Sequence, residues 1–330
     1  MASEQPERLY RYRSLSTTTI ESLCHDQLWF SNPAAFNDPL DCRPVVESDS
    51  DKATLRNILA ELIRRRVEQE TLASLNSAKL KGDQVTAHAQ QVAQQTAVNE
   101  LNEAAYQATN PDYECGAEQA ECHLLTSKIQ SELLKRYERG VCCFSSAYDN
   151  PLLWSHYGDQ HKGICIGYRI DKLTREPPQK VAYGGSRIIH TSLIADALLN
   201  QNAEAQQALD HSTLLRKAPP WEYENEWRMI GDRGAHDSTL ILSDITFGLR
   251  CSDAFRYTIY KAFEQRKDIQ FFDMWEVRGT FDLKREPVDT GEMCAYYPRN
   301  HHSIMKAFSD ISALDDEEGY VSPIDKNISE

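Results

Sequence analysis

Three glutamates at alternate positions are the first feature of this sequence that suggests chemistry. Glu222, Glu224 and Glu226 follow two consecutive prolines. If their segment is a strand, a period of two places all three carboxylates on one face. Like charges held side by side raise the affinity of at least one of them for a proton or a cation. The pattern indicates a metal site or carboxylates that stabilise positive charge in a reaction. The alternative is an exposed edge neutralised by Lys217 or Arg228.

Candidate binding residues occur far from these glutamates in the chain. Arg11 and Arg13 alternate within an aromatic-rich segment that is typical of a strand. A guanidinium there can fork onto phosphate or ribose oxygens, although surface salt bridges are the plainer interpretation. Ser145 follows the apolar run at 141–144, and Tyr157 lies in a short segment of helical character. A hydroxyl followed by an aromatic face can hold a flat polar ligand. The alternative is that Ser145 only caps a turn and that the aromatic ring only packs in the core.

The elements that position these residues are expected to be mixed strands and helices. Strands are predicted at 9–14, 27–30, 141–144, 164–168, 181–183 and 245–248, and near Phe271 and Trp275. Helices are predicted after a cap at Thr17, Thr18 or Thr19, after Pro151, and over 191–217 and 252–266. Aromatic and β-branched residues mark the strands, and apolar residues at helical spacing mark the helices. The pattern predicts an α+β fold.

Residues 51–139 interrupt this core. Leu55, Ile58, Leu62 and other apolar residues there follow helical spacing, and a later stretch rich in Gln, Ala and Asn is typical of a solvated helix. We therefore expect one α+β core built from 1–50 and 140–300, with a helical insertion that acts as a lid or a partner-binding arm. Residues 301–330 are acidic and are expected to form a mobile tail.

Composition narrows the class of protein. The net charge of −14 disfavours non-specific binding to nucleic acid, because an acidic surface repels phosphate. The nine scattered cysteines fit a reducing cytoplasm. No apolar run approaches the roughly 18 residues of a membrane span, and the N-terminus has no apolar secretory core, so we expect no membrane contact. Gly184-Gly185-Ser186 is too short to count as a phosphate-binding loop.

Several motifs together resemble a widespread bacterial family described only as a domain of unknown function. They cover most of the chain outside the insertion and the tail. The motifs are Leu9-Tyr10-Arg11-Tyr12-Arg13-Ser14, Phe36-Asn37-Asp38-Pro39, Cys143-Phe144-Ser145, Trp154-Ser155-His156-Tyr157, Lys162-Gly163 and Trp221-Glu222-Tyr223-Glu224-Asn225-Glu226-Trp227-Arg228. This resemblance implies a shared fold but no activity.

The order of these parts is also similar to the ADP-ribosyltransferase superfamily. That family has a strand with His or Arg, a strand ending near small hydroxyl residues, a tyrosine that stacks on nicotinamide, and a glutamate opening a late strand. Arg11, Ser145, Tyr157 and Glu226 match these places, with Glu224 two residues before. The resemblance implies a split mixed or antiparallel sheet. The chain departs from the pattern in lacking a Ser-Thr-Ser triplet and in its long insertion.

The resemblance implies an enzyme that consumes NAD. It would transfer ADP-ribose to an unknown acceptor, protein or nucleic acid, or hydrolyse NAD, with no metal required. Glu226 would stabilise the oxocarbenium-like state and Glu224 would orient or deprotonate the acceptor. Arg11, supported by Arg13, would hold ribose or phosphate. Tyr157 would stack on the nicotinamide, and backbone groups beside Ser145 would bind its amide. By analogy, a toxin or phage-defence effector is the expected setting.

Two other classes of function fit the same residues. A metal-dependent nuclease or hydrolase would use Asp38, Asp41, Glu224 and Glu226, because carboxylates are the usual ligands of such ions. A non-catalytic recognition module would use the insertion at 51–139 as its partner-binding arm. Equilibrium dialysis separates the NAD-consuming enzyme from the metal-dependent one. Retention of NAD favours the former, and retention of Mn²⁺ favours the latter.

Overall fold

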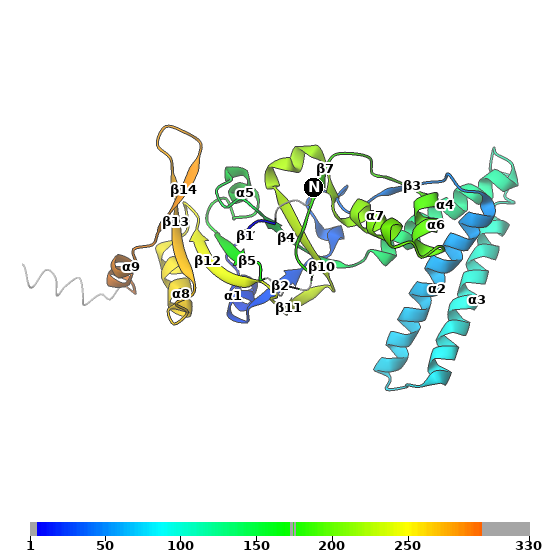
Figure 1. The fold of residues 1–330 in the computed structure, drawn as a ribbon, viewed down its shortest axis with the longest axis horizontal. Helices are drawn as coiled ribbons and strands as arrows, with labels where there is room; N and C mark the ends of the chain where they lie inside the picture. Colours follow the sequence, from blue (N-terminus) through cyan, green and yellow to red (C-terminus); the bar gives the residue numbers. More distant parts are fainter. Residues whose placement is uncertain (1–4, 172–173, 175, 299–330) are drawn as a thin grey trace, which may run out of the picture.

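A mixed eight-stranded sheet lies at the centre of the molecule (Figure 1). The computed structural model describes residues 5–171, 174 and 176–298, so the acidic tail expected at 301–330 lies outside the described residues. The strand order is β14-β13-β12-β5-β1-β4-β10-β6, and every neighbouring pair is antiparallel except β12 with β13. The prediction of an α+β fold is therefore confirmed.

The bounds of the sheet strands match most of the predicted ranges. They are β1 (Arg8–Arg13), β4 (Gly140–Ser145), β5 (Ile164–Arg169), β6 (Gln179–Lys180), β10 (Glu226–Gly231), β12 (Ile241–Phe247), β13 (Gln270–Glu276) and β14 (Leu283–Pro287). Three two-stranded pairs flank the sheet: β2 (Gln27–Phe30) with β11 (Gly234–Asp237), β3 (Val45–Glu47) with β8 (Ile188–His190), and β7 (Ala182–Tyr183) with β9 (Arg216–Lys217). The two strands expected near Phe271 and Trp275 are one strand, β13.

The sheet opens between β1 and β4. Strand β1 pairs with β5 along its whole length, but its ladder with β4 has one residue pair, Tyr10 with Ser145. Glu226 at the start of β10 also pairs with Ser145. Directly paired residues of antiparallel strands point to the same face, so Tyr10, Ser145 and Glu226 share one face of the sheet.

The two faces of the sheet have different cores. On one face, Leu9, Phe144 and Trp227 pack with residues of α1 (Thr17–Cys24) and α8 (Asp253–Phe263). On the other face, Tyr12 and Trp154 form a smaller aromatic core, with ring centroids 5.1 Å apart. Trp154 belongs to α5 (Pro151–His156), which Asn150 caps by accepting from two backbone N–H groups. This fully buried anchor holds α5 over the opening between β1 and β4.

The helices of the insertion gather at one end of the molecule (Figure 1). They are α2 (Lys52–Ser77), α3 (Asp83–Gln107) and α4 (Ala117–Arg136). The described helix α3 buries only alanines, which lets it pack closely on α2. Leucines and isoleucines of α2 and α4 share a core with α6 (Thr191–Leu198) and α7 (Ala203–Leu214). The three predicted helices are present, and their role as a lid or an arm stays a prediction.

Two helix boundaries differ from those predicted. Ser16, not a threonine of the 17–19 run, caps α1, because its side chain accepts from the backbone N–H of Thr19. The single helix expected over 191–217 is two helices, since Asn202 caps a new one and the chain then enters β9. A last helix, α9 (Thr290–Tyr296), was not expected. In the part of the chain that the structure describes, no helix has the length and apolar character to cross a bilayer.

Gly163 is the tightest backbone contact near the opening. A β-carbon there would overlap the carbonyl oxygen of Arg13, whereas one at Gly116 would meet nothing within 4 Å. We expect Gly163→Ala to lower the free energy of unfolding by roughly 1–3 kcal/mol, because the end of β1 must shift. Urea unfolding measures this, with Gly116→Ala as the control. Equal stability of the two variants would contradict the packing described.

Candidate functional site

A cavity of about 480 Å³ lies where β1 and β4 separate. Its wall includes all six residues predicted as catalytic or cofactor-binding: Arg11, Arg13, Ser145, Tyr157, Glu224 and Glu226. The volume lies in the range of small-molecule sites, which are about 300–1,000 Å³. Residues more than 200 positions apart in the sequence therefore face one space.

The predicted strand through the three glutamates is wrong. Residues Pro219–Glu224 form a 3-10 helix, Asn225 takes a left-handed conformation with φ 45°, and β10 begins only at Glu226. Paired prolines suit the first turn of such a helix but not a central strand. The turn at Asn225, and not a period of two, brings Glu224 back toward Glu226. Glu222 is left exposed.

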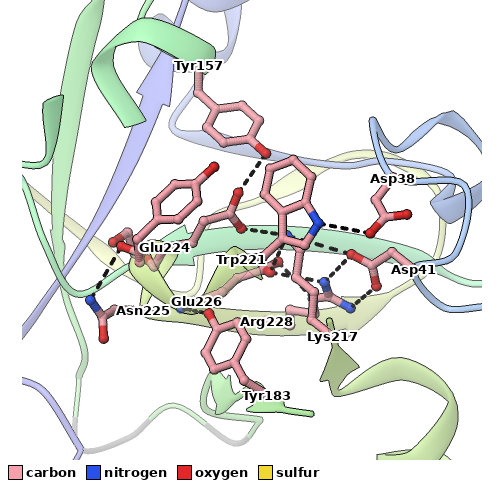
Figure 2. Close-up of polar contacts among 12 residues, drawn as sticks. Asp38, Asp41, Tyr157, Tyr183, Lys217, Trp221, Glu224, Asn225, Glu226 and Arg228 are labelled. Carbon is pink, nitrogen blue, oxygen red and sulfur yellow. Dashed lines mark hydrogen bonds and ion pairs between the residues drawn. The ribbon is translucent and has the colours of Figure 1, made fainter. Parts of the chain in front are cut away.

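A buried ion network, shown in Figure 2, contributes Asp41, Lys217, Glu224 and Glu226 to the wall of the cavity. Lys217 of β9 contacts Glu224, and its Nζ lies 2.9 Å from Glu226 Oε2 and 3.7 Å from Asp41 Oδ2. Arg228 is fully buried and bridges two of the same acids, with Nη2 2.7 Å from Asp41 Oδ2 and Nε 2.8 Å from Glu226 Oε1. Three carboxylates thus share two cations, which leaves one negative charge unbalanced when all five are ionised.

That unbalanced charge falls on Glu224. Burial alone would raise the pKa of Glu226, but Arg228 and Lys217 outweigh burial and hold it at about 2. At Glu224 burial prevails over the attraction of Lys217, so the pKa of this carboxyl is raised. The hydroxyl of Tyr157 donates to Glu224 Oε1 at 2.8 Å, and burial raises the pKa of this phenol, which keeps its proton (Figure 2). Of the two glutamates, Glu224 is therefore the one whose carboxylate takes up a proton at the higher pH.

Ser145 has a local structural partner. Its hydroxyl donates to the carbonyl of Glu224 at 2.6 Å and accepts from the N–H of Ala147 at 3.0 Å. The side chain thus secures the turn that carries Glu224. The predicted contact of neighbouring backbone groups with an amide ligand stays a prediction.

The two arginines reach the cavity from the other side of β1. Arg11 follows Tyr10, so its side chain points to the face opposite Glu226, where it donates to the carbonyl of Trp29 at 2.8 Å. Among the described residues, Arg13 has no hydrogen-bond or ion-pair partner. Burial and the neighbouring Arg11 lower the pKa of Arg13 to about 10. An anion in the cavity would relieve the cost of this partly buried cation.

Sequence reasoning missed the central role of Lys217 and Arg228. Both were considered only as partners of an exposed edge. The available signal was the spacing of Glu226 and Arg228, which a strand places on one face. The ring of Trp221 lies against Lys217, with its centroid 5.0 Å from Nζ, and its indole N–H donates to Asp38.

The same network bears on the metal-dependent alternative. Lys217 lies between Asp41, Glu224 and Glu226, where a shared metal ion would have to bind. The fourth acid of that hypothesis, Asp38, accepts from the indole of Trp221 instead. Within 5–171, 174 and 176–298, no group of three or more His, Cys, Asp or Glu side chains is arranged to hold a metal ion.

Fold and site together define an α+β protein with paired, buried carboxylates at an opening in its sheet. Residues 153–229 match the model of the family described as "Protein of unknown function (DUF2971)". This stretch contains the motifs around Tyr157 and Glu226, so the predicted resemblance to a family of unknown function is confirmed there. No curated protein and no solved structure matches the chain. The comparisons do not support the resemblance to ADP-ribosyltransferases.

The low pKa of Glu226 predicts an acid-dependent loss of stability. Because its pKa in the folded protein lies below that of an unfolded glutamate, its ionised form stabilises the fold above the unfolded pKa, and this stabilisation is lost as pH falls toward about 2. We expect the wild type to lose roughly 1 kcal/mol more than Glu226→Gln between pH 7 and 3.5. Urea unfolding at several pH values tests this.

The exposed Glu222 provides the matched control for this measurement. Glu222→Gln should keep the pH dependence of the wild type. Identical slopes for wild type and Glu226→Gln would show that the network does not hold the Glu226 carboxyl as described.

Proposed function

We propose that the cavity binds NAD and that the protein breaks the bond between nicotinamide and ribose, as an ADP-ribosyltransferase or NAD glycohydrolase. The observation that carries this proposal is the division of charge in the cavity. One side has the ion network, in which carboxylates outnumber cations by three to two, and the other has two arginines, Arg11 and Arg13. NAD has the complementary division, with a cationic nicotinamide ring and an anionic pyrophosphate.

The acidic side favours a cation or a group that becomes cationic. Glu226 stays ionised, and the partly satisfied Glu224 lies under the hydroxyl of Tyr157. Cleavage of the nicotinamide–ribose bond passes through an oxocarbenium-like state, which preorganised carboxylates stabilise. An aromatic ring at Tyr157 supports stacking of the nicotinamide, which adds on the order of 1 kcal/mol beyond burial.

The basic side favours an anion. Arg13 is partly buried beside a like charge and has no carboxylate partner among the described residues. Arg11 has five N–H groups, and Trp29 accepts from one of its nitrogens, which leaves N–H groups without an acceptor among the described residues. Guanidinium groups fork onto phosphate oxygens, so a pyrophosphate at this side would gain two ion pairs.

The order of three strands is a further argument for the proposal. Strands β1, β4 and β10 carry Arg11, Ser145 and the start at Glu226, and they are consecutive in the sheet order. The sheet opens between the first two of them. These features support an ADP-ribosyltransferase-like split sheet, which we include in the proposal.

In the reaction we propose, the bond between C1′ of the ribose and the nicotinamide nitrogen breaks, and nicotinamide leaves with the bonding electron pair. The negative charge of Glu226 stabilises the positive ribose. The acceptor hydroxyl or water forms a new bond to C1′, and its proton passes to Glu224, whose raised pKa suits a proton carrier. The acceptor is protein, nucleic acid or water. A cytoplasmic toxin or phage-defence effector is the proposed setting.

Conservative variants test these roles. We expect Glu226→Gln to reduce the rate of NAD consumption at least about a hundredfold, because the amide keeps the shape and removes the charge. Glu224→Gln should lower the rate by a similar factor. It should also abolish the part of the pH dependence of the rate that comes from ionisation of Glu224, whose pKa is raised. Nicotinamide release measures the rate, and circular dichroism checks folding.

The exposed Glu222 is again the control, because it precedes the same turn but lies outside the cavity wall. Glu222→Gln should consume NAD at the wild-type rate. Retained turnover in the folded Glu226→Gln variant, or no retention of NAD by the wild type in equilibrium dialysis, contradicts the proposal. Retention of Mn²⁺ without NAD would favour the metal-dependent alternative.

A further inference from the structure

A second, smaller cavity of about 150 Å³ adjoins the first and shares part of its wall. The shared residues are Asp38, Asp41 and Lys217. The rest of its wall includes three arginines from distant segments, Arg43, Arg187 and Arg216. We call this space the arginine cavity.

None of these three guanidinium groups forms an ion pair with a residue that the structure describes. Arg187 donates through Nε and Nη2 to the backbone carbonyl of Arg43, at 3.3 and 2.8 Å, which fixes it beside that residue. Arg216 donates through Nη1 to the carbonyl of Gly184 at 2.8 Å, while its Nε is buried and has no acceptor among the described residues. A buried donor left unpaired costs free energy until a ligand accepts from it.

The two acids in the wall do not serve as counter-ions for these arginines. Asp41 is held by Arg228 and Lys217. Asp38 accepts from the indole of Trp221 and from the N–H of Leu40. In a chain with a net charge of −14, the arginine cavity is thus a local concentration of positive charge.

A glycine turn makes room for one of the arginines. Gly184 and Gly185 both have positive φ, 78° and 80°, which glycine adopts without strain. A β-carbon on Gly185 would overlap Nη1 of Arg216. The Gly184-Gly185-Ser186 segment is too short to cradle a phosphate with its own backbone, and here it seats a guanidinium instead.

We infer that the arginine cavity is a phosphate subsite, which takes the phosphate of a free nucleotide or the terminal phosphate of a nucleic-acid strand. Phosphate offers several charged oxygens, and guanidinium forks match their geometry. Because Lys217 lines both cavities and pairs with Glu224 and Glu226, a ligand held here lies next to the ion network of the main cavity. The inference does not require that NAD binds in the main cavity, so each can fail alone.

Binding of inorganic pyrophosphate to the full chain tests this, measured by calorimetry at low salt. We expect Arg43→Gln and Arg216→Gln each to weaken binding by about tenfold or more, as for loss of a charge-assisted hydrogen bond. Arg43 is exposed and its side chain makes no hydrogen bond with a described residue, so its variant should fold normally. Arg139→Gln removes an exposed guanidinium outside the cavity and should bind like the wild type.

Equal binding by all four proteins, or no binding by the wild type, would overturn the inference. ADP and a 5′-phosphorylated trinucleotide then distinguish the sources of the phosphate. Tighter binding of ADP assigns the subsite to a free nucleotide, and tighter binding of the trinucleotide assigns it to a strand end. An unphosphorylated trinucleotide that binds as tightly as the phosphorylated one would also overturn the inference.

Discussion

The pairing of Lys217 and Arg228 with Asp41, Glu224 and Glu226 is the interaction on which the site depends. Ionised groups removed from water lose several kcal/mol each unless partners replace their hydration. These five side chains come from the loop after β2, from β9, from the 3-10 helix and from β10, so their mutual neutralisation holds four segments in place. Loss of either cation would leave a buried carboxylate without compensation, which is far more costly than loss of an exposed pair.

Because the carboxylates of this network outnumber its cations, the network can bind a further cation or proton. Two cations fix Glu226 in its ionised form, while Glu224 retains a raised pKa beneath Tyr157. A set of fully compensated charges would only stabilise the fold, whereas a residual charge at a cavity wall attracts a cation or a proton. The opening between β1 and β4 gives ligands access to that charge, and Arg11 and Arg13 provide the opposite charge across the same space.

Much of this arrangement was predictable from local patterns. Aromatic-rich segments and short apolar runs identified β1, β2, β4 and β5, and the pattern of apolar and polar residues identified the three helices of the insertion. The order of the motifs predicted that the six candidate residues face one cavity, and all six lie in its wall. The strand period failed at Glu222 and Glu224, because the left-handed turn at Asn225 overrides it. The burial of Arg228 and its bridge to Asp41, 187 positions away, depend on tertiary packing that no local pattern encodes.

The most direct test of the account is a crystal structure of the protein with a non-cleavable NAD analogue. We expect the nicotinamide ring against Tyr157 and the C1′ atom of the ribose beside Glu224 and Glu226. The pyrophosphate should lie on the side of Arg11 and Arg13. An analogue bound elsewhere on the molecule, or bound with its pyrophosphate facing the carboxylates, would contradict this expectation.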